Sequence, residues 1–250
     1  MTAPAALDLP VPRLVVWRHG RTDWNATGRF QGQLDPPLDA EGRAQAARTA
    51  PHLAATGLDP GTTVVVASDL VRAADTAAAL TDVLGVPLRL DERLREHGLG
   101  SWEGLTRDEV AERHPEQYAD WLAGRPVHGR GGEQSADVAR RALAALQDLP
   151  PAEVAVVVTH GGTAGRLIEA LLELGPQHRR VFGPLANCGW SELARHGERW
   201  RLMRHNTVVA ALPGRLEGPA PGSPATAPAD AAATPEGAAP PPPQDADVVL

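Results

Sequence analysis

Two histidines, His19 and His160, each stand shortly after an apolar run and directly before a glycine. The runs before them, Leu14–Trp17 and Val154–Val158, are rich in β-branched residues and predict strands buried on both faces of a sheet. Ligands bind at the carboxyl ends of strands in open α/β sheets, so we expect the two imidazoles to face each other there. A single histidine in such a place is more often a hydrogen-bonded structural residue, and the pairing argues against that alternative.

A glycine and two arginines beside these histidines favour an anionic ligand. Gly161, which follows His160, lets backbone N–H groups come close to a ligand. Arg18 precedes His19, and Arg72 lies one turn into a helix predicted after the strand 63–67. A guanidinium group binds phosphate oxygens through paired hydrogen bonds. Taken alone, Arg72 is better explained as a surface residue of an amphipathic helix.

A carboxyl group stands in the glycine-rich loop 93–106, which follows the predicted strand 87–90. This residue, Glu96, has Glu92 and Glu103 nearby. Beside two histidines and two arginines, a carboxyl group could protonate a departing alkoxide. The alternative for any one of these glutamates is a solvated loop residue.

Together, these side chains predict a phosphoryl-transfer pocket made of Arg18, His19, Arg72, Glu96 and His160. One histidine attacks phosphorus and forms a phosphohistidine, which divides a hard displacement into two easier steps. The arginines and the second histidine stabilise charge on the equatorial oxygens, while Glu96 protonates the leaving oxygen and then activates water. We expect no metal and no other cofactor, because guanidinium groups supply the positive charge. The sequence outside its C-terminal tail also has no cluster at metal-ligand spacing.

Other candidate nucleophiles fail on their surroundings. A second Arg-His-Gly, at 195–197, follows no buried strand and is expected in a hairpin turn. A cysteine phosphatase would need arginine six positions after Cys188, where Ala194 stands. Ser191 does not lie in the G-x-S-x-G pattern of a serine hydrolase.

The rest of the pattern alternates strands with helices. Strands buried on both faces are predicted at 14–17, 63–67, 87–90 and 154–158, edge strands at 190–193 and 200–205, and helices at 39–56, 69–84, 135–149 and 163–174. Pro51 should kink or split the first helix, and Ser68 should cap the second. This alternation predicts an α/β fold, with helices on both faces of a mostly parallel central sheet.

Composition divides the chain into three regions. We expect residues 1–12 to be a flexible N-terminus, 13–215 to form one domain, and 216–250 to be a disordered tail. The tail has nine Pro and ten Ala and almost nothing apolar to bury. It also carries five acidic residues and no basic ones, so the net charge of −7 would be −2 without it. A nearly neutral domain with no basic block predicts no nucleic-acid partner.

The amino-acid composition limits the cellular compartment and the catalytic chemistry that the protein can have. One cysteine, no secretory leader and no apolar run of membrane-spanning length predict a cytoplasmic protein without membrane contact. All 24 basic residues are arginine, which excludes a Walker-type phosphate loop and a Schiff-base lysine. The expected partner is a small phosphorylated metabolite, and a homodimer is the assembly to test.

Over about residues 13–209 the sequence resembles the histidine phosphatase superfamily, with its phosphoglycerate-mutase-like fold, a three-layer αβα sandwich. The resemblance rests on five ordered motifs: Arg18-His19-Gly20 with Thr22 and Asn25, Ser68-Asp69-Leu70 with Arg72, Leu94-Arg95-Glu96 leading to Gly100-Ser101-Trp102-Glu103-Gly104, Gly131-Gly132-Glu133, and Thr159-His160-Gly161-Gly162. It implies that His19 is the nucleophile and Glu96 the proton donor. It also implies that Arg18, Arg72 and His160 hold the phosphoryl group, with help from Asn25.

The spacing of these motifs resembles the phosphatase branch of that family. Glu96 and His160 are 64 positions apart, whereas the mutase branch has a longer insertion there. A more open pocket admits water and favours hydrolysis. The stretches 29–42, 130–133, 187–190 and 200–202 are similar to those of actinobacterial members that dephosphorylate glucosyl-3-phosphoglycerate.

This finer resemblance implies that Gln31 helps to hold the sugar or glycerate part of a substrate. In the turn 130–133 it also places a histidine where this chain has Arg130, with His128 displaced by two positions. A phosphoglycerate mutase, an α-ribazole phosphatase and a non-catalytic module that binds phosphorylated partners are the alternatives.

Overall fold

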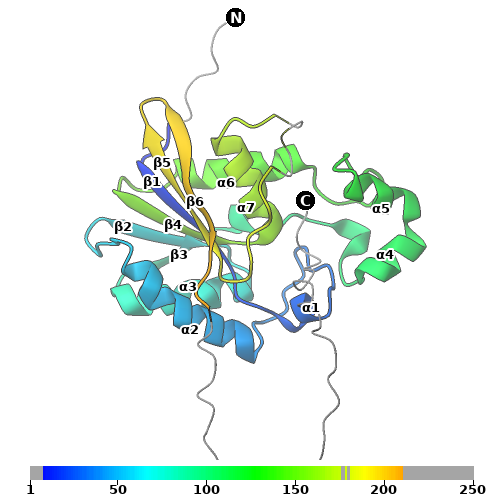
Figure 1. The fold of residues 1–250 in the computed structure, drawn as a ribbon, viewed down its shortest axis with the longest axis horizontal. Helices are drawn as coiled ribbons and strands as arrows, with labels where there is room; N and C mark the ends of the chain where they lie inside the picture. Colours follow the sequence, from blue (N-terminus) through cyan, green and yellow to red (C-terminus); the bar gives the residue numbers. More distant parts are fainter. Residues whose placement is uncertain (1–7, 176–177, 179–180, 211–250) are drawn as a thin grey trace, which may run out of the picture. The chain divides into compact units, whose positions relative to one another are not determined.

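The computed structural model describes residues 8–175, 178 and 181–210, which form three layers around a central sheet (Figure 1). The order of the strands across this sheet is β3-β2-β4-β1-β5-β6. Their bounds are β1 Arg13–Arg18, β2 Thr63–Ala67, β3 Leu88–Leu90, β4 Val154–Thr159, β5 Trp190–His196 and β6 Arg199–Thr207. Strands β1 to β4 are parallel to one another, while β5 and β6 are antiparallel to their neighbours. The prediction of an αβα sandwich with a mostly parallel sheet is confirmed.

Long helices cover both faces of the sheet (Figure 1). Helices α2 (Ala40–Ala54) and α3 (Val71–Leu84) pack on one face, and α6 (Ser135–Gln147) and α7 (Gly161–Leu171) pack on the other. The loops carry shorter elements: α1 Asp23–Ala26, the 3₁₀ turns η1 Glu92–Leu94 and η2 Gly100–Trp102, α4 Arg107–Arg113 and α5 Pro115–Leu122. Within the described residues, no helix combines the length and the apolar character needed to cross a membrane.

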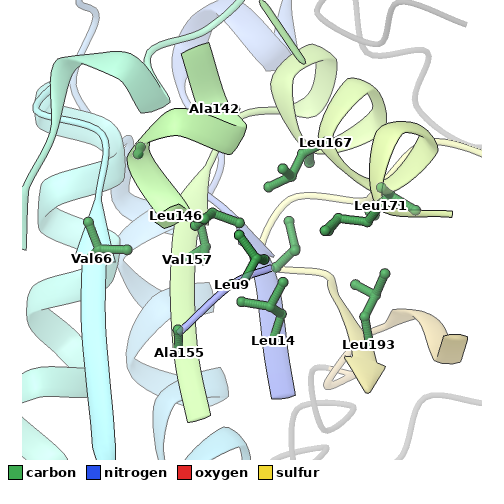
Figure 2. Close-up of a cluster of buried hydrophobic side chains, with 14 of the residues drawn as sticks. Leu9, Leu14, Val66, Ala142, Leu146, Ala155, Val157, Leu167, Leu171 and Leu193 are labelled. Atoms are coloured by element: carbon green, nitrogen blue, oxygen red, sulfur yellow. The ribbon is translucent and has the colours of Figure 1, made fainter. Parts of the chain in front are cut away.

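Each face of the sheet has its own apolar core. Between the sheet and α6 and α7 lies the cluster of Figure 2, in which Leu146 and Leu167 meet Leu14 and Val157 of the strands. Between the sheet and α2 and α3, small alanines bring the helices close to the valines of β2 and β4. A fully buried leucine or valine stabilises the fold by about 1.5–3 kcal/mol relative to an exposed one. The two cores therefore hold the central strands rigidly, and these strands carry the site.

The register of β1 and β4 decides where the two histidines lie. Arg18 is paired with Thr159, so the two parallel strands end level with each other. The N–H of His19 donates to the Thr159 carbonyl at 3.0 Å. His19 and His160 are therefore the first residues beyond the same sheet edge, as predicted.

The folded part begins earlier than residue 13. Leu9 and Val11 are 4% and 1% exposed and belong to the core of Figure 2. The carbonyls of Pro10 and Pro12 accept hydrogen bonds from Ala152 and Arg195. The prediction of a flexible 1–12 segment is therefore wrong for residues 8–12, because their apolar side chains complete a core that the strand pattern did not reveal. Residues 1–7 and the tail 216–250 lie outside the described residues.

Two local predictions about helices are wrong. Pro51 does not split α2, which runs unbroken to Ala54. Pro51 lies in the last turn, and the buried Ala46, Ala50 and Leu53 keep this helix packed on the sheet despite the lost N–H bond. Helix α3 starts at Val71 with Leu70 as its N-cap, whereas Ser68 accepts a hydrogen bond from the Leu70 N–H in the preceding turn.

Strand burial also differs from the prediction at the two sides of the sheet. Leu90 of β3 is 56% exposed because β3 is an edge strand with a neighbour on one side only. Strand β5, predicted at an edge, is interior because β6 pairs with its outer side. The second Arg-His-Gly was predicted to lie in a hairpin turn and to follow no buried strand. Only Gly197 lies in the turn, because β5 runs to His196 and its first four residues are buried.

Candidate active site

His19 and His160 meet at the edge of the sheet. Their ring centroids are 5.1 Å apart, the planes are inclined by 60°, and both side chains are buried. No other pair of histidine rings in the described part of the chain is recorded in contact. The sequence argument, which placed each ring at the end of a parallel strand, therefore accounts for the central geometry of the site.

The hydrogen bond at Nδ1 of His19 determines its tautomer. Nδ1 lies 2.7 Å from the carbonyl oxygen of Gly20, which can only accept, so Nδ1 carries the proton. The lone pair is then on Nε2, and Nε2 is buried without a hydrogen-bond partner among the described residues. Burial lowers the pKa of His19 well below its ordinary 6.5, and the charges of Arg72 and Arg18 lower it further. At neutral pH His19 therefore has a nucleophilic nitrogen.

His160 has hydrogen-bonding capacity that the protein does not use. Neither ring nitrogen has a hydrogen-bond partner among the described residues, although the side chain is fully buried. Burial lowers the pKa of His160 well below 6.5, and the positive charges around it act in the same direction. A buried neutral imidazole with one free N–H fits a ligand oxygen.

Arg18 and Arg72 are both fully buried. The alternative that Arg72 is a surface residue of an amphipathic helix is therefore wrong. Nη1 of Arg18 donates to the Leu185 carbonyl at 2.8 Å. The two terminal nitrogens of Arg72 donate to the carbonyls of Leu34 and Gly32 at 2.7 and 2.8 Å. These bonds fix both guanidinium groups close enough to His19 to lower its pKa.

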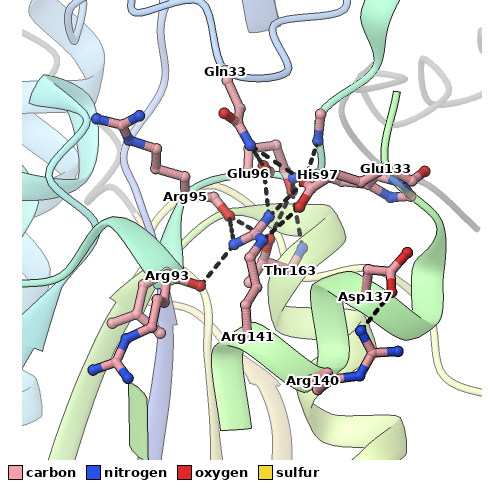
Figure 3. A network of polar contacts seen from close by, with 12 residues as sticks. Gln33, Arg93, Arg95, Glu96, His97, Glu133, Asp137, Arg140, Arg141 and Thr163 are labelled. Atoms are coloured by element: carbon pink, nitrogen blue, oxygen red, sulfur yellow. Dashed lines mark hydrogen bonds and ion pairs between the residues drawn. The ribbon is translucent and has the colours of Figure 1, made fainter. Parts of the chain in front are cut away.

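Glu96 lies at the N-terminus of α7 (Figure 3). This helix begins directly after His160. Its Oε1 accepts hydrogen bonds from the backbone N–H of His97 at 2.7 Å and of Thr163 at 2.9 Å. Oε2 accepts one from the backbone N–H of Gly162 at 3.0 Å. The carboxyl group is 1% exposed, so the alternative of a solvated loop residue is excluded for Glu96.

Arg141 of α6 holds the loop that carries Glu96 (Figure 3). It donates to the carbonyls of Arg93, Arg95 and Glu96 at 2.6–2.9 Å. The same guanidinium pairs with both carboxylate oxygens of Glu133. Sequence reasoning missed this arginine because nothing in the helix pattern of α6 distinguishes it from Arg140 beside it.

The residues predicted to bind substrate lie in one hydrogen-bonded group. Asn25 is the third residue of α1, where it forms a capping box with Thr22. Gln31 is buried and accepts a hydrogen bond from the Thr22 hydroxyl at 3.1 Å. Asn187, which the sequence did not assign a role, donates to the His19 carbonyl and to Asn25.

Gly161, the third predicted substrate-binding residue, opens α7 immediately after His160, and it is buried. At the neighbouring position 162, the contact between Glu96 and the helix requires a glycine. A Cβ at Gly162 would lie 2.7 Å from Oε1 of Glu96, so only glycine lets the carboxyl group reach the helix end.

Two exposed histidines and the cysteine do not join the site. His196 of the second Arg-His-Gly is exposed, and so is His128. Burial raises the pKa of the Cys188 thiol to about 12, which rules it out as a thiolate nucleophile. Among the described residues, no three His, Cys, Asp or Glu side chains gather as metal ligands would.

Comparison with known proteins agrees with this geometry. The model of the histidine phosphatase superfamily (branch 1) matches residues 14–208. A glucosyl-3-phosphoglycerate phosphatase of Mycolicibacterium vanbaalenii is 39% identical over 213 residues, covering 77% of this chain and 93% of its own. A probable phosphoglycerate mutase of an Enterobacter species is 33% identical over 208 residues, covering 81% and 94%.

A solved structure of a mycobacterial glucosyl-3-phosphoglycerate phosphatase in complex with VO3 is 38% identical. It superposes with a TM-score of 0.71 over 78% of this chain and 99% of its own. With the family model spanning the whole sheet and both histidines, the chain belongs to branch 1 of the histidine phosphatase superfamily and is a phosphoric monoester hydrolase.

Proposed function

We propose that the protein hydrolyses small phosphate monoesters through a phosphohistidine formed on His19. The observation that carries this proposal is the pair of facing rings at the sheet edge, 5.1 Å apart. One ring is held in the tautomer with its lone pair on Nε2, and the other has both nitrogens available. Low pKa values keep both rings neutral at pH 7, so His19 can attack and His160 can donate a hydrogen bond.

The reaction runs in two steps. Nε2 of His19 forms a bond to phosphorus while the ester P–O bond breaks, and Glu96 gives its proton to the leaving oxygen. Oε2 of Glu96 suits this task because, among the described residues, it accepts a hydrogen bond from Gly162 alone, whereas Oε1 accepts several. Water then attacks phosphorus, its proton returns to Glu96, and the P–N bond breaks to release phosphate.

The positive groups act on the phosphoryl oxygens in both steps. Arg18 and Arg72 have guanidinium groups fixed by backbone carbonyls, so little reorganisation accompanies the gain of charge on those oxygens. The N–H of His160 adds a neutral donor. Arginine supplies the charge that a metal ion supplies in other phosphatases, so no step of this mechanism requires a metal.

Glucosyl-3-phosphoglycerate is the substrate that we propose for this site. The proposal is supported by relatives 36–39% identical that are named for this activity and match more than nine-tenths of their own length. Action on a metabolite of this kind accords with a cytoplasmic protein. Assembly as a homodimer and the lack of nucleic-acid partners remain predictions.

Turnover of p-nitrophenyl phosphate in EDTA tests the mechanism. We expect activity in the wild type and none above background in His19→Ala. His196→Ala is the matched control, because it changes the same tripeptide at an exposed hairpin turn. A wild type without turnover that still binds phosphate would favour a non-catalytic binding module, and an active His19→Ala would exclude the phosphohistidine.

Measuring kcat/KM for a set of phosphorylated metabolites tests the proposed substrate. The kcat/KM for glucosyl-3-phosphoglycerate should exceed the values for 3-phosphoglycerate and α-ribazole phosphate. A mutase would instead convert 3-phosphoglycerate to its 2-phospho isomer without releasing phosphate. Comparing isomer formation with phosphate release therefore separates the two activities.

A further inference from the structure

Arg130 is a buried cation that forms no ion pair with a carboxylate of the described residues. The residue is 6% exposed, and its Nε and Nη1 have no hydrogen-bond partner among the described residues. Nη2 lies 3.1 Å from Nε2 of His97, and the guanidinium carbon lies 5.2 Å from the centre of the Trp102 ring. Burial lowers the pKa of Arg130 to about 10, which still leaves it charged at pH 7. Buried arginines are nearly always paired, so this one calls for an anion.

The backbone holds Arg130 in a fixed place. Its carbonyl accepts from the Ser101 N–H at 2.8 Å. A Cβ on Gly100 would lie 2.1 Å from that same carbonyl, and a Cβ on Gly132 would lie 2.2 Å from the Gly98 carbonyl. The segments 98–101 and 130–132 therefore pack backbone against backbone, and Arg130 is positioned before any ligand arrives.

Arg130 lines a cavity of about 210 Å³ between α5 and the N-terminal parts of α6 and α7. The other charged groups of this cavity already have partners. Glu133 pairs with Arg141, Arg166 pairs with Glu169, and Arg125 pairs with Asp120. His97, also in the lining, has a pKa lowered by burial. Among the described residues Arg130 is therefore the one arginine of this lining that forms no ion pair, and the only carboxylate whose charge acts on it is that of Glu103.

The cavity lies beside the chain segment that carries Glu96, the residue that we propose as the proton donor. His97, which lines it, follows Glu96 directly, and a Cβ on Gly162 would lie 3.4 Å from the Cβ of His97. Arg166, also in the lining, is one turn further along α7. A leaving alcohol that is protonated by Glu96 and extends toward His97 would reach this cavity.

We propose that Arg130 binds a carboxylate on the leaving alcohol, so that the preferred substrates are phosphate monoesters with a carboxylate group a few bonds from the ester oxygen. This inference rests on the proposed function. Guanidinium and carboxylate form charge-assisted hydrogen bonds, and the Trp102 ring beneath the guanidinium keeps its orientation.

Two substrates that differ only in the carboxylate test this inference. 3-Phosphoglycerate and glycerol 3-phosphate have the same phosphate ester and the same secondary hydroxyl, but the second has CH₂OH in place of the carboxylate. We expect the wild type to prefer 3-phosphoglycerate roughly 10- to 100-fold in kcat/KM, the usual range for a hydrogen bond to a charged group. Arg130→Met should remove this preference by lowering only the 3-phosphoglycerate value, and Arg130→Lys should restore part of it.

Arg107→Met is the matched control. Trp102, Trp121 and Phe30 form an aromatic cluster, with ring centroids 5.3–6.3 Å apart. Arg107 lies over Trp121 of this cluster, 5.3 Å from the ring centre, but it does not line the cavity. Its loss should leave the ratio between the two substrates unchanged.

Three outcomes would overturn the inference. One is a wild type without preference, a result that needs no variant. The second is an equal fall for both substrates in Arg130→Met, as expected if Arg130 only supports the aromatic cluster. The third is a wild type that hydrolyses neither substrate nor p-nitrophenyl phosphate, which refutes the proposed function and this inference with it. Hydrolysis of p-nitrophenyl phosphate without the carboxylate preference refutes the inference alone.

Discussion

The chemistry of His19 depends on burial, which lowers its pKa most, and on three neighbouring residues. The Gly20 carbonyl holds the proton on Nδ1, and the positive charges of Arg72 and Arg18 oppose a second proton. A histidine with a free lone pair at neutral pH is what nucleophilic attack on phosphorus requires. The same arginines would stabilise the phosphoryl group, so they serve the nucleophile and the transferred group together.

Replacing Arg72 by methionine should therefore change both the rate and the pH profile. The loss of one positioned charged donor should lower kcat by about 10²-fold or more. Because Arg72 lowers the pKa of His19, its removal should also move the acidic limb of kcat/KM toward higher pH. Steady-state kinetics of p-nitrophenyl phosphate between pH 4 and 8 measure both effects. A near-normal rate with an unchanged acidic limb would contradict the role of Arg72.

Gly162→Ala should displace Glu96 while leaving the histidines in place. The new Cβ would lie 2.7 Å from Oε1 of Glu96 and 3.3 Å from its carboxyl carbon. We expect losses of at least 10-fold for an alkyl phosphate, whose leaving group needs a proton, and much smaller losses for p-nitrophenyl phosphate.

The Glu96→Gln variant should show the same split between the two kinds of substrate. Gly165→Ala in the same helix is the control, because a Cβ there meets nothing within 4 Å. Equal losses for alkyl and nitrophenyl esters in Gly162→Ala would speak against Glu96 as the acid.

At the residue scale, the sequence predicts the role of a side chain where that role follows from its position at the end of a strand. His19 and His160 could be found because each directly follows a buried parallel strand. Arg130 and Arg141 could not be found in this way. Their roles come from contacts between segments that are distant in the chain, such as that of Arg141 with the carbonyls of 93–96.

At the scale of elements, helix α6 acts on the site through a single guanidinium group. Arg141 bonds to three carbonyls of the loop before and at Glu96 and to the Glu133 carboxylate (Figure 3). Thr163 at the start of α7 donates its hydroxyl to the Arg95 carbonyl. The proposed acid is thus held between two helices that pack on the same face of the sheet.

Arg141→Met should loosen that loop. We expect the free energy of unfolding to fall by about 1–3 kcal/mol, as for the loss of charge-assisted hydrogen bonds in a partly buried place. We also expect kcat/KM for an alkyl phosphate to fall further than that for p-nitrophenyl phosphate. Urea unfolding and steady-state kinetics measure the two effects.

Arg140→Met tests whether this effect is specific to Arg141. Arg140 is the preceding residue on α6, but its side chain is 73% exposed, and within the part of the chain that the structure describes it pairs with Asp137 alone. We expect little change in stability or rate. If both variants change stability and rate alike, the hydrogen bonds of Arg141 to the loop before Glu96 do not contribute to function.

Helix α2 is predicted correctly, but the sequence pattern does not explain why it contains a glycine. Gly42 weakens the helical pattern of α2, yet the helix forms there. A Cβ on Gly42 would lie 2.0 Å from the Arg21 carbonyl, and one on Gly20 would lie 2.5 Å from the Gly42 carbonyl. The glycines allow the loop after His19 to touch α2, which is a tertiary requirement that local helix propensity does not contain.

At the scale of the whole molecule, alternation of strands and helices predicts the three layers, because parallel strands need crossovers that cover both faces. The order of the strands is not contained in that alternation. The exposure of β3 and the interior place of β5 both follow from the order, so both were missed. The burial of Leu9 and Val11 was missed for a similar reason, since these residues belong to no periodic element.

The molecule buries several neutral histidines, and this should make its stability depend on pH. The pKa values of His19, His97 and His160 are all lowered by burial. In the unfolded chain these groups bind protons near pH 6.5, whereas in the folded protein they bind them only at lower pH. Their contribution is therefore complete above about pH 6.5 and is lost as the pH falls toward the folded pKa values.

Urea unfolding at pH 8, 7, 6 and 5 should show the free energy of unfolding falling below about pH 6.5, by up to about 1.4 kcal/mol per pH unit for each histidine. His97→Leu should make this fall less steep by the share of one histidine. His52→Leu should leave it unchanged, because His52 is exposed on α2. An identical slope in His97→Leu and the wild type would show that the imidazole of His97 takes up its proton as readily in the folded protein as in the unfolded chain.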